Sequence, residues 1–178
     1  IEVGRKFFKL SEHPKVQAHA GDARHFLRSQ QDQRWNLIFG DAYAGIRSIP
    51  SHLVTQEFFQ LVSDHLTPEG VFVMNAITAV QGEKAALLSG ILTTLRSVFP
   101  YVETFAVQGP RLATQNVIIL ASRQDWKPWL TDRFFAATTW QSRVLNSHVA
   151  SNQVPQNGPL FTDDFNPVDR IIARGLLD

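Results

Sequence analysis

The chain alternates short apolar runs with helix-like segments, and this alternation constrains its fold more than any other feature. Such runs lie at 35–39, 70–77 and 115–122, and the first of them is followed by a Gly-Asp pair. The segment 16–20, which we interpret as a further short strand, also ends at a Gly-Asp pair. Short continuous apolar runs are typical of strands buried on both faces of a parallel sheet. Strands that alternate with helices predict a three-layer α/β fold.

Apolar residues at helical spacing separate the runs. This spacing predicts helices over 1–10, 23–30, 53–66, 83–99 and 167–177. A further strand is expected at 101–107, and the short connection around Gly109-Pro110 favours its antiparallel pairing with 115–122. We therefore expect a mostly parallel sheet that ends in an antiparallel strand pair.

Length and composition favour a single folded domain. The chain has 178 residues, of which 44% are hydrophobic and 19% charged, as in ordinary folded domains. We interpret 1–178 as one partial domain, with the Trp-rich part 125–178 as its C-terminal extension. The chain starts inside a helix-like pattern with no capping residue ahead of it, so we expect it to be part of a longer protein.

Charge and composition argue against several kinds of partner. Seventeen basic residues stand against sixteen acidic ones, with no basic run, so no nucleic-acid partner is expected. Without cysteine there are no thiolate ligands, and the histidines lack the spacing of a zinc site, so we expect no metal. No stretch approaches the ~20 apolar residues of a membrane span and no secretory signal occurs. We expect a cytoplasmic protein, with a membrane anchor farther upstream as the alternative.

Two acidic residues stand where predicted strands end. Asp22 and Asp41 each follow a glycine at the end of a predicted strand. Ligands of open parallel sheets bind at the carboxyl ends of the strands, so both carboxylates are candidate site residues. Each also has a structural interpretation as a helix cap or turn residue. Asp163 and Asp164 are interpreted as turn residues at a helix entry rather than a metal pair, because no third ligand lies near in sequence.

Several motifs together resemble the spermidine synthase, or polyamine aminopropyltransferase, family. They are GDARHFL (21–27), WNLIFGDAYAG (35–45), the segment 49–75 and LFTDDFNPVDRI (160–171). The resemblance implies the Rossmann-like fold of class I S-adenosylmethionine methyltransferases, and it suggests a homodimer. It also implies that the first two strands and the glycine-rich cofactor loop precede residue 1, since no GxGxxG occurs in the chain.

The resemblance also assigns roles to individual residues. Asp22, with Ala23 beside it, would bind the adenine of a nucleoside co-substrate. Asp41 would contact that co-substrate and act as the catalytic carboxylate that keeps the attacking amine unprotonated. Tyr43 and His52 would line the pocket of the acceptor amine, although each also has an interpretation as a packing or surface residue.

Two residues near this site have a less definite meaning. Asn75, at the end of the run 70–77, is interpreted either as a contact to the co-substrate or as a satisfied turn amide. Ala44 stands where active spermidine synthases have the second aspartate of a DxxD pattern. The missing carboxylate argues against ordinary putrescine as acceptor, because a hydrogen bond to a charged group contributes about 1.5–3 kcal/mol.

Three functions follow as hypotheses. The first is transfer of an aminopropyl group from decarboxylated S-adenosylmethionine to a small amine, which the retained Asp41 favours. The second is methyl transfer from S-adenosylmethionine, which Ala44 favours. The third is a truncated module of this fold without catalysis, which the missing glycine-rich loop favours.

Overall fold

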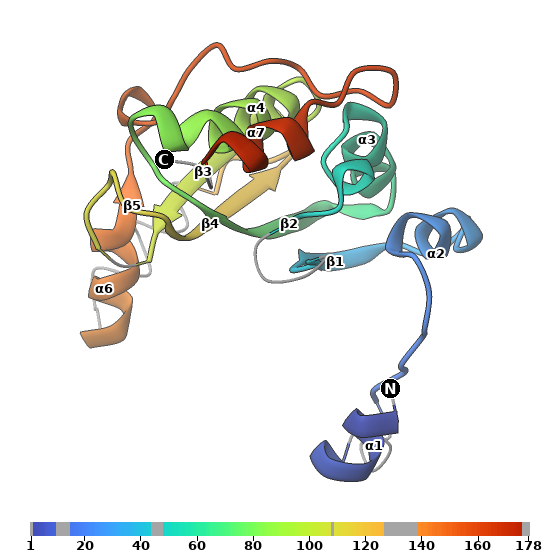
Figure 1. Ribbon diagram of the computed structural model, residues 1–178. Coiled ribbons are helices and arrows are strands. Elements are labelled where there is room, and N and C mark those ends of the chain that lie inside the picture. The colour runs from blue at the N-terminus through green and yellow to red at the C-terminus, as the bar shows by residue number, and fades with distance from the viewer. Residues whose placement is uncertain (1, 10–14, 44–47, 108, 127–138, 176–178) are drawn as a thin grey trace. The chain divides into compact units, whose positions relative to one another are not determined.

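The computed structural model describes residues 2–9, 15–43, 48–107, 109–126 and 139–175 (Figure 1). It divides into two compact units, Ile1–Gln31 and Asp32–Asp178, each of which is described by itself.

The first unit contains two short helices. These are α1 (Glu2–Phe8) and α2 (Ala23–Ser29), which confirm the predicted helices within the described residues; Ile1 and Leu10 lie outside that range. The expected strand at 16–20 is wrong, because this segment has no regular secondary structure. A strand needs a neighbour to pair with, and the described part of this unit offers no other extended segment.

The second unit is built on a five-stranded sheet with the order β1-β2-β4-β3-β5. Its strands are β1 (Trp35–Gly40), β2 (Leu66–Thr78), β3 (Tyr101–Ala106), β4 (Gln115–Ser122) and β5 (His148–Val149). The predicted antiparallel pairing of β3 with β4 is confirmed. The sheet is mixed: β1 pairs with β2 in parallel, whereas β4 and β5 join by antiparallel pairing. The strand expected at 16–20, which would have added parallel character, did not form.

Three helices of this unit lie on the same side of the sheet (Figure 1). They are α3 (Gln56–Asp64), α4 (Ala86–Arg96) and α7 (Val168–Gly175). The helix α6 (Thr139–Ser147) contacts β3, and short 3-10 turns are found at η1 (Ser51–Leu53), η2 (Glu83–Ala85) and η3 (Ser151–Gln153). The predicted helices 53–66 and 83–99 are thus each divided into a 3-10 turn and an α-helix. For α3 the cause is Thr55, whose Oγ1 accepts a hydrogen bond from the Phe58 amide at 3.2 Å and caps the helix there.

The turn expected at Thr67–Gly70 lies inside β2. Trp35 of β1 pairs with Leu66, and Leu37 already pairs with Val71, so the residues between form an irregularity in the strand. This interruption re-aligns the two strands before their regular parallel pairing begins.

The sheet buries one face more completely than the other. On one face Phe72, Met74 and Ile119 are at most 4% exposed. On the other, Leu37 and Phe39 of β1 are 58% and 57% exposed, so the prediction that this run is buried on both faces is wrong. A continuous apolar run does not distinguish a strand buried on both faces from a strand buried on one, because the run does not show which faces the neighbouring elements cover.

Candidate functional site

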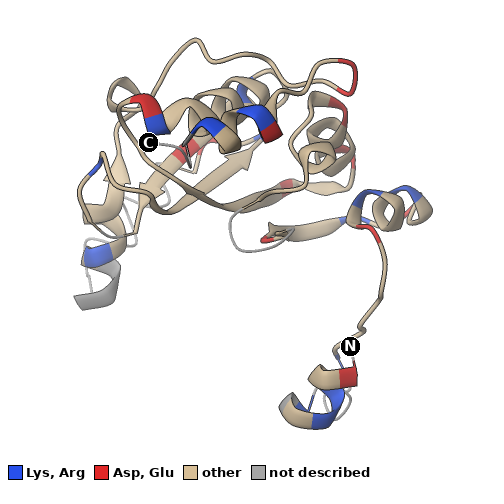
Figure 2. Cartoon of the chain, in the orientation of Figure 1, with Lys and Arg blue, Asp and Glu red and all other residues tan. Residues whose placement is uncertain are grey.

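The carboxyl ends of β1 and β2 bring three polar residues together. The two strands are parallel, and Gly40 lies opposite Met74, so Asp41 and Asn75 follow at neighbouring positions. Phe39 and Val73 are also paired, and side chains two residues farther along a strand return to the same face. Asp41 and Asn75 therefore share the less buried face of the sheet. Figure 2 shows the acidic position at the carboxyl end of β1.

Asn75 joins the other two residues through hydrogen bonds. Its Nδ2 donates to Asp41 Oδ1 at 2.9 Å. Its main-chain carbonyl accepts from the Tyr43 hydroxyl, also at 2.9 Å. One residue of β2 thus orients both the carboxylate after β1 and the aromatic side chain two positions later.

The Tyr43 side chain is neutral at physiological pH. Burial, followed by the negative charge of Asp41, raises the pKa of Tyr43 to about 12, against a smaller opposing hydrogen bond from the Ile77 backbone. Since the hydroxyl hydrogen is directed to the Asn75 carbonyl, the Tyr43 oxygen can accept a hydrogen bond from a ligand. Tyr43 can therefore bind an amine N–H but is a poor base for removing its proton.

The side-chain oxygen of Asn75 is buried without a hydrogen-bond partner. The amide orientation follows from its neighbour, because only Nδ2 can donate to the Asp41 carboxylate. An unpaired buried acceptor destabilises a fold by about 1–3 kcal/mol. The hydrogen bond from Asn75 Nδ2 to Asp41 thus leaves Oδ1 of the same amide without a partner.

Asp22 occupies the structural role that its position allowed. Its Oδ1 accepts a hydrogen bond from the His25 amide at 2.9 Å and caps α2, which begins at Ala23. This cap belongs to the first unit, whereas Asp41 belongs to the second. Binding of adenine by Asp22 and Ala23, and the meeting of Asp22 with Asp41 at one pocket, stay predictions.

The remaining predicted residues lie elsewhere in the second unit or outside the described ranges. His52 is exposed in η1, a turn anchored by Asn166, whose Nδ2 donates to the Ser51 carbonyl at 2.7 Å. Its contact with an acceptor amine stays a prediction. Ala44 lies outside the described residues.

Asp163 and Asp164 lie in a bend of the chain ahead of α7. The Thr162 amide donates to the Phe165 carbonyl at 2.9 Å, and the Asp163 amide donates to Glu57 of α3 at 3.0 Å. Within the described ranges, no three His, Asp or Glu side chains gather as they would around a metal ion. No helix in the same ranges is both long enough and apolar enough to cross a bilayer.

Asn75 is the residue whose importance the sequence did not reveal. Its position after an apolar run left a co-substrate contact and a turn amide equally open. Its pairing with Asp41 depends on the register of β1 against β2, across the irregularity at Thr67–Gly70, and no local pattern determines that register.

Comparison with known proteins places this geometry in context. Residues 1–129 match the family model of the spermine/spermidine synthase domain. Over 118 residues, the chain is 29% identical to the eEF1A lysine and N-terminal methyltransferase of Bos taurus, covering 61% of this chain and 16% of that protein. Over 118 residues it is 30% identical to a polyamine aminopropyltransferase of Synechococcus, covering 66% of this chain and 37% of that protein. The chain thus spans well under half the length of both relatives.

Solved structures show the same fold. A spermidine synthase in complex with the transition state analogue AdoDATO superposes with a TM-score of 0.66 at 18% identity, covering 85% of this chain and 55% of that one. Human methyltransferase-like protein 13 in complex with SAH superposes with a TM-score of 0.61 at 23% identity, covering 84% and 68%. The expected Rossmann-like methyltransferase fold is therefore confirmed. Since the family model covers well over half of its residues, the chain belongs to the spermine/spermidine synthase domain family.

Proposed function

We propose that this chain carries the acceptor side of a transferase that moves an aminopropyl group from decarboxylated S-adenosylmethionine to an amine. The observation that carries the proposal is Asp41, held by Asn75 at the carboxyl edge of the parallel pair β1-β2. Ligands of this class of sheet bind at that edge. The relation to aminopropyltransferases supplies the type of reaction.

The reaction forms one carbon–nitrogen bond and breaks one carbon–sulfur bond. The lone pair of the acceptor nitrogen attacks the aminopropyl carbon bound to the sulfonium. The electrons of the carbon–sulfur bond pass to sulfur, which leaves as the neutral thioether methylthioadenosine. The product nitrogen carries the positive charge that the sulfur loses. Because the acceptor amine is protonated at neutral pH and then has no lone pair, it must first give a proton to a base, and Asp41 is the carboxylate that we assign to this role.

The arrangement of Asp41 fits that task. Its Oδ1 is occupied by Asn75 Nδ2, and the exposed carboxylate retains Oδ2 as a second acceptor. The Tyr43 oxygen offers a further acceptor to the N–H bonds of the same amine. Fixing the carboxylate before the substrate arrives reduces the reorganisation that the proton transfer requires.

A nucleoside sulfonium as donor is supported by the relatives. The spermidine synthase of the same fold is in complex with AdoDATO, and human methyltransferase-like protein 13 is in complex with SAH. In this chain we assign the adenine to Asp22 and Ala23, as the family motif implies.

Methyl transfer from S-adenosylmethionine is the second candidate. It is favoured by Ala44, since a single carboxylate suits an acceptor with one amine better than a diamine. It is also favoured by the similarity to the eEF1A lysine and N-terminal methyltransferase. The product would then be S-adenosylhomocysteine, with the same demand for a base at Asp41.

Thermal unfolding with three nucleosides tests both candidates. Methylthioadenosine or decarboxylated S-adenosylmethionine should stabilise an aminopropyltransferase, and S-adenosylhomocysteine a methyltransferase. A ligand at 100 times its dissociation constant adds about 2.7 kcal/mol to the free energy of unfolding. If none of the three raises the melting temperature, both candidates are wrong for this chain.

The variant Asp41→Asn tests the catalytic role. Because general acid–base catalysis contributes about 10²- to 10⁴-fold, transfer to an amine should fall by a factor in that range while the nucleoside still binds. Asp64→Asn is the matched control, because Asp64 is also exposed and accepts a hydrogen bond from a side-chain amide, that of Gln60 at 2.9 Å. Full activity in Asp41→Asn would exclude the assigned role.

A further inference from the structure

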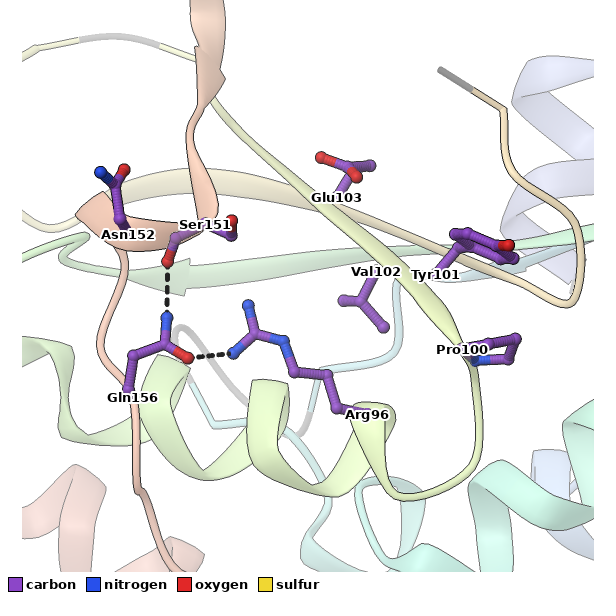
Figure 3. Close-up of a pocket in the computed structure, with 8 residues that line it drawn as sticks. All are labelled: Arg96, Pro100, Tyr101, Val102, Glu103, Ser151, Asn152 and Gln156. Carbon is purple, nitrogen blue, oxygen red and sulfur yellow. Dashed lines mark hydrogen bonds between the residues drawn. The ribbon is translucent and has the colours of Figure 1, made fainter. Parts of the chain in front are cut away.

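A polar cavity lies in the same unit as Asp41. Its volume is about 460 Å³, within the range of roughly 300–1,000 Å³ that holds small ligands. Figure 3 shows its walls: Arg96 at the end of α4, Tyr101 and Glu103 at the start of β3, and Ser151 and Gln156 from the segment around η3.

This cavity is separate from the Asp41 site. Tyr101 of β3 pairs with Ser122 of β4, which in turn pairs with Val71 near the amino end of the parallel stretch of β2. Asp41 and Asn75 lie toward the carboxyl end of that stretch. The cavity therefore lies toward the amino ends of the parallel strands and the Asp41 site at their carboxyl ends, so a ligand in one site does not occupy the other.

The guanidinium of Arg96 is held in place at the cavity. Gln156 Nε2 donates to the carbonyls of Ser151 and Val154, which fixes the side-chain amide. The Gln156 Oε1 then accepts from Arg96 Nη1 at 3.0 Å. Figure 3 shows the other end of the guanidinium directed toward the side of the cavity where Ser151 and Glu103 lie.

Arg96 retains positive charge that its neighbours only partly compensate. Burial lowers the pKa of Arg96 below its ordinary value, and the attraction of Glu103 opposes this effect. Among the described residues Arg96 makes one hydrogen bond, to a neutral amide, and no ion pair. A partly buried guanidinium with free donors is the group that proteins use to bind carboxylates and phosphates.

The opposite wall carries negative charge. The Glu103 side chain is 14% exposed, and its Oε2 lies 2.7 Å from Nε2 of His148. A simple anion would be attracted by Arg96 and repelled by Glu103. A ligand with a positive group on the side of Glu103 would complement the charge of both walls, and the Tyr101 ring and Val102 supply apolar surface for the carbons between.

We propose that this cavity binds a small zwitterion, with a carboxylate or phosphate on Arg96 and an ammonium group toward Glu103. The site is independent of alkyl transfer at Asp41. Its ligand would be an amino acid or an amino phosphate of a few carbon atoms.

Titration of the full chain with four probes tests the class of ligand. The probes are γ-aminobutyrate, phosphoethanolamine, butyrate and butylamine, and binding is followed by chemical-shift changes in amide NMR spectra. At least one of the two zwitterions should shift the resonances of 96–103 and 151–156, and butyrate and butylamine should bind at least about tenfold more weakly. Comparing the two zwitterions separates the carboxylate from the phosphate source.

Variants then test the residues. Arg96→Met should weaken the zwitterion at least about tenfold, Arg96→Lys should weaken it less, and Glu103→Gln should reduce its advantage over butyrate. Arg111→Met is the matched control, because Arg111 also donates to a glutamine of this region, Gln153 at 2.8 Å, but does not line the cavity.

Three results would overturn the proposal. They are no binding of any probe to the wild-type chain, butyrate binding as tightly as γ-aminobutyrate, and unchanged zwitterion binding in a folded Arg96→Met or Arg96→Lys protein. Nucleoside binding measured on the same samples reports on the Asp41 site separately.

Discussion

At the scale of single residues, the candidate site depends on one asparagine. Asn75 holds Asp41 with its side chain and Tyr43 with its main chain, while its own Oδ1 stays unpaired. Removing it should leave the sheet intact but release the carboxylate that the proposed reaction uses. Its effect should therefore be on the rate of transfer more than on nucleoside affinity.

Asn75→Leu replaces the amide by an apolar group of similar size. We expect kcat for amine transfer to fall about 10- to 100-fold, because a hydrogen bond to a charged group contributes about 1.5–3 kcal/mol. Steady-state kinetics and nucleoside titration measure the two effects. Asn116→Leu, an exposed asparagine on β4, should change neither. An equal loss in both variants would show that Asn75 has only a structural role.

Tyr43 gives the site a signature that needs no substrate. The chain has two tyrosines, Tyr43 and Tyr101, and the pKa of Tyr43 is raised to about 12. An alkaline titration followed by tyrosinate absorbance should contain a late step near that pH, absent in Tyr43→Phe and present in Tyr101→Phe. Because deprotonation is disfavoured in the folded state, this tyrosine should also make stability fall as pH rises from about 10 to 12. A late step that survives Tyr43→Phe would contradict the burial of its hydroxyl.

At the scale of elements, Gly90 in the middle of α4 has a packing explanation. A Cβ at this position would lie 2.0 Å from Cζ of Phe161, whose side chain is fully buried. Thr94 of the same helix accepts a hydrogen bond from the Phe161 amide at 2.9 Å. The glycine weakens the helix by up to about 1 kcal/mol but lets the C-terminal segment pack against it.

Gly90→Ala should therefore destabilise the protein although alanine is the better helix former. Overpacking costs about 1–3 kcal/mol and the gain in helix propensity is about 1 kcal/mol, so the net loss should be up to about 2 kcal/mol by urea denaturation. Gly21→Ala is the control, because nothing lies within 4 Å of its Cβ. Adding Phe161→Leu to Gly90→Ala should recover part of the loss. A more stable Gly90→Ala would exclude this packing.

At the scale of the whole molecule, local patterns predicted the elements better than their partners. The runs at 35–39 and 115–122 became β1 and β4, whereas the two-residue β5 was not anticipated. The predictions that β1 is buried on both faces and that 16–20 forms a strand were wrong, because both properties depend on which segments lie beside a strand. The pair Gly40-Asp41 correctly marked the end of β1, and Gly21-Asp22 marked the start of α2. Only the register of β1 against β2 joined Asp41 to Asn75.

The position of Phe161 in the chain also bears on how the protein is made. Val154, Phe161 and Val168 are at most 5% exposed, and all belong to the last quarter of the sequence. On the ribosome, α4 emerges long before the side chains that cover it. The second unit therefore reaches its final packing only after the segment around Phe161 has been made, and until then the face of α4 that this segment covers is exposed.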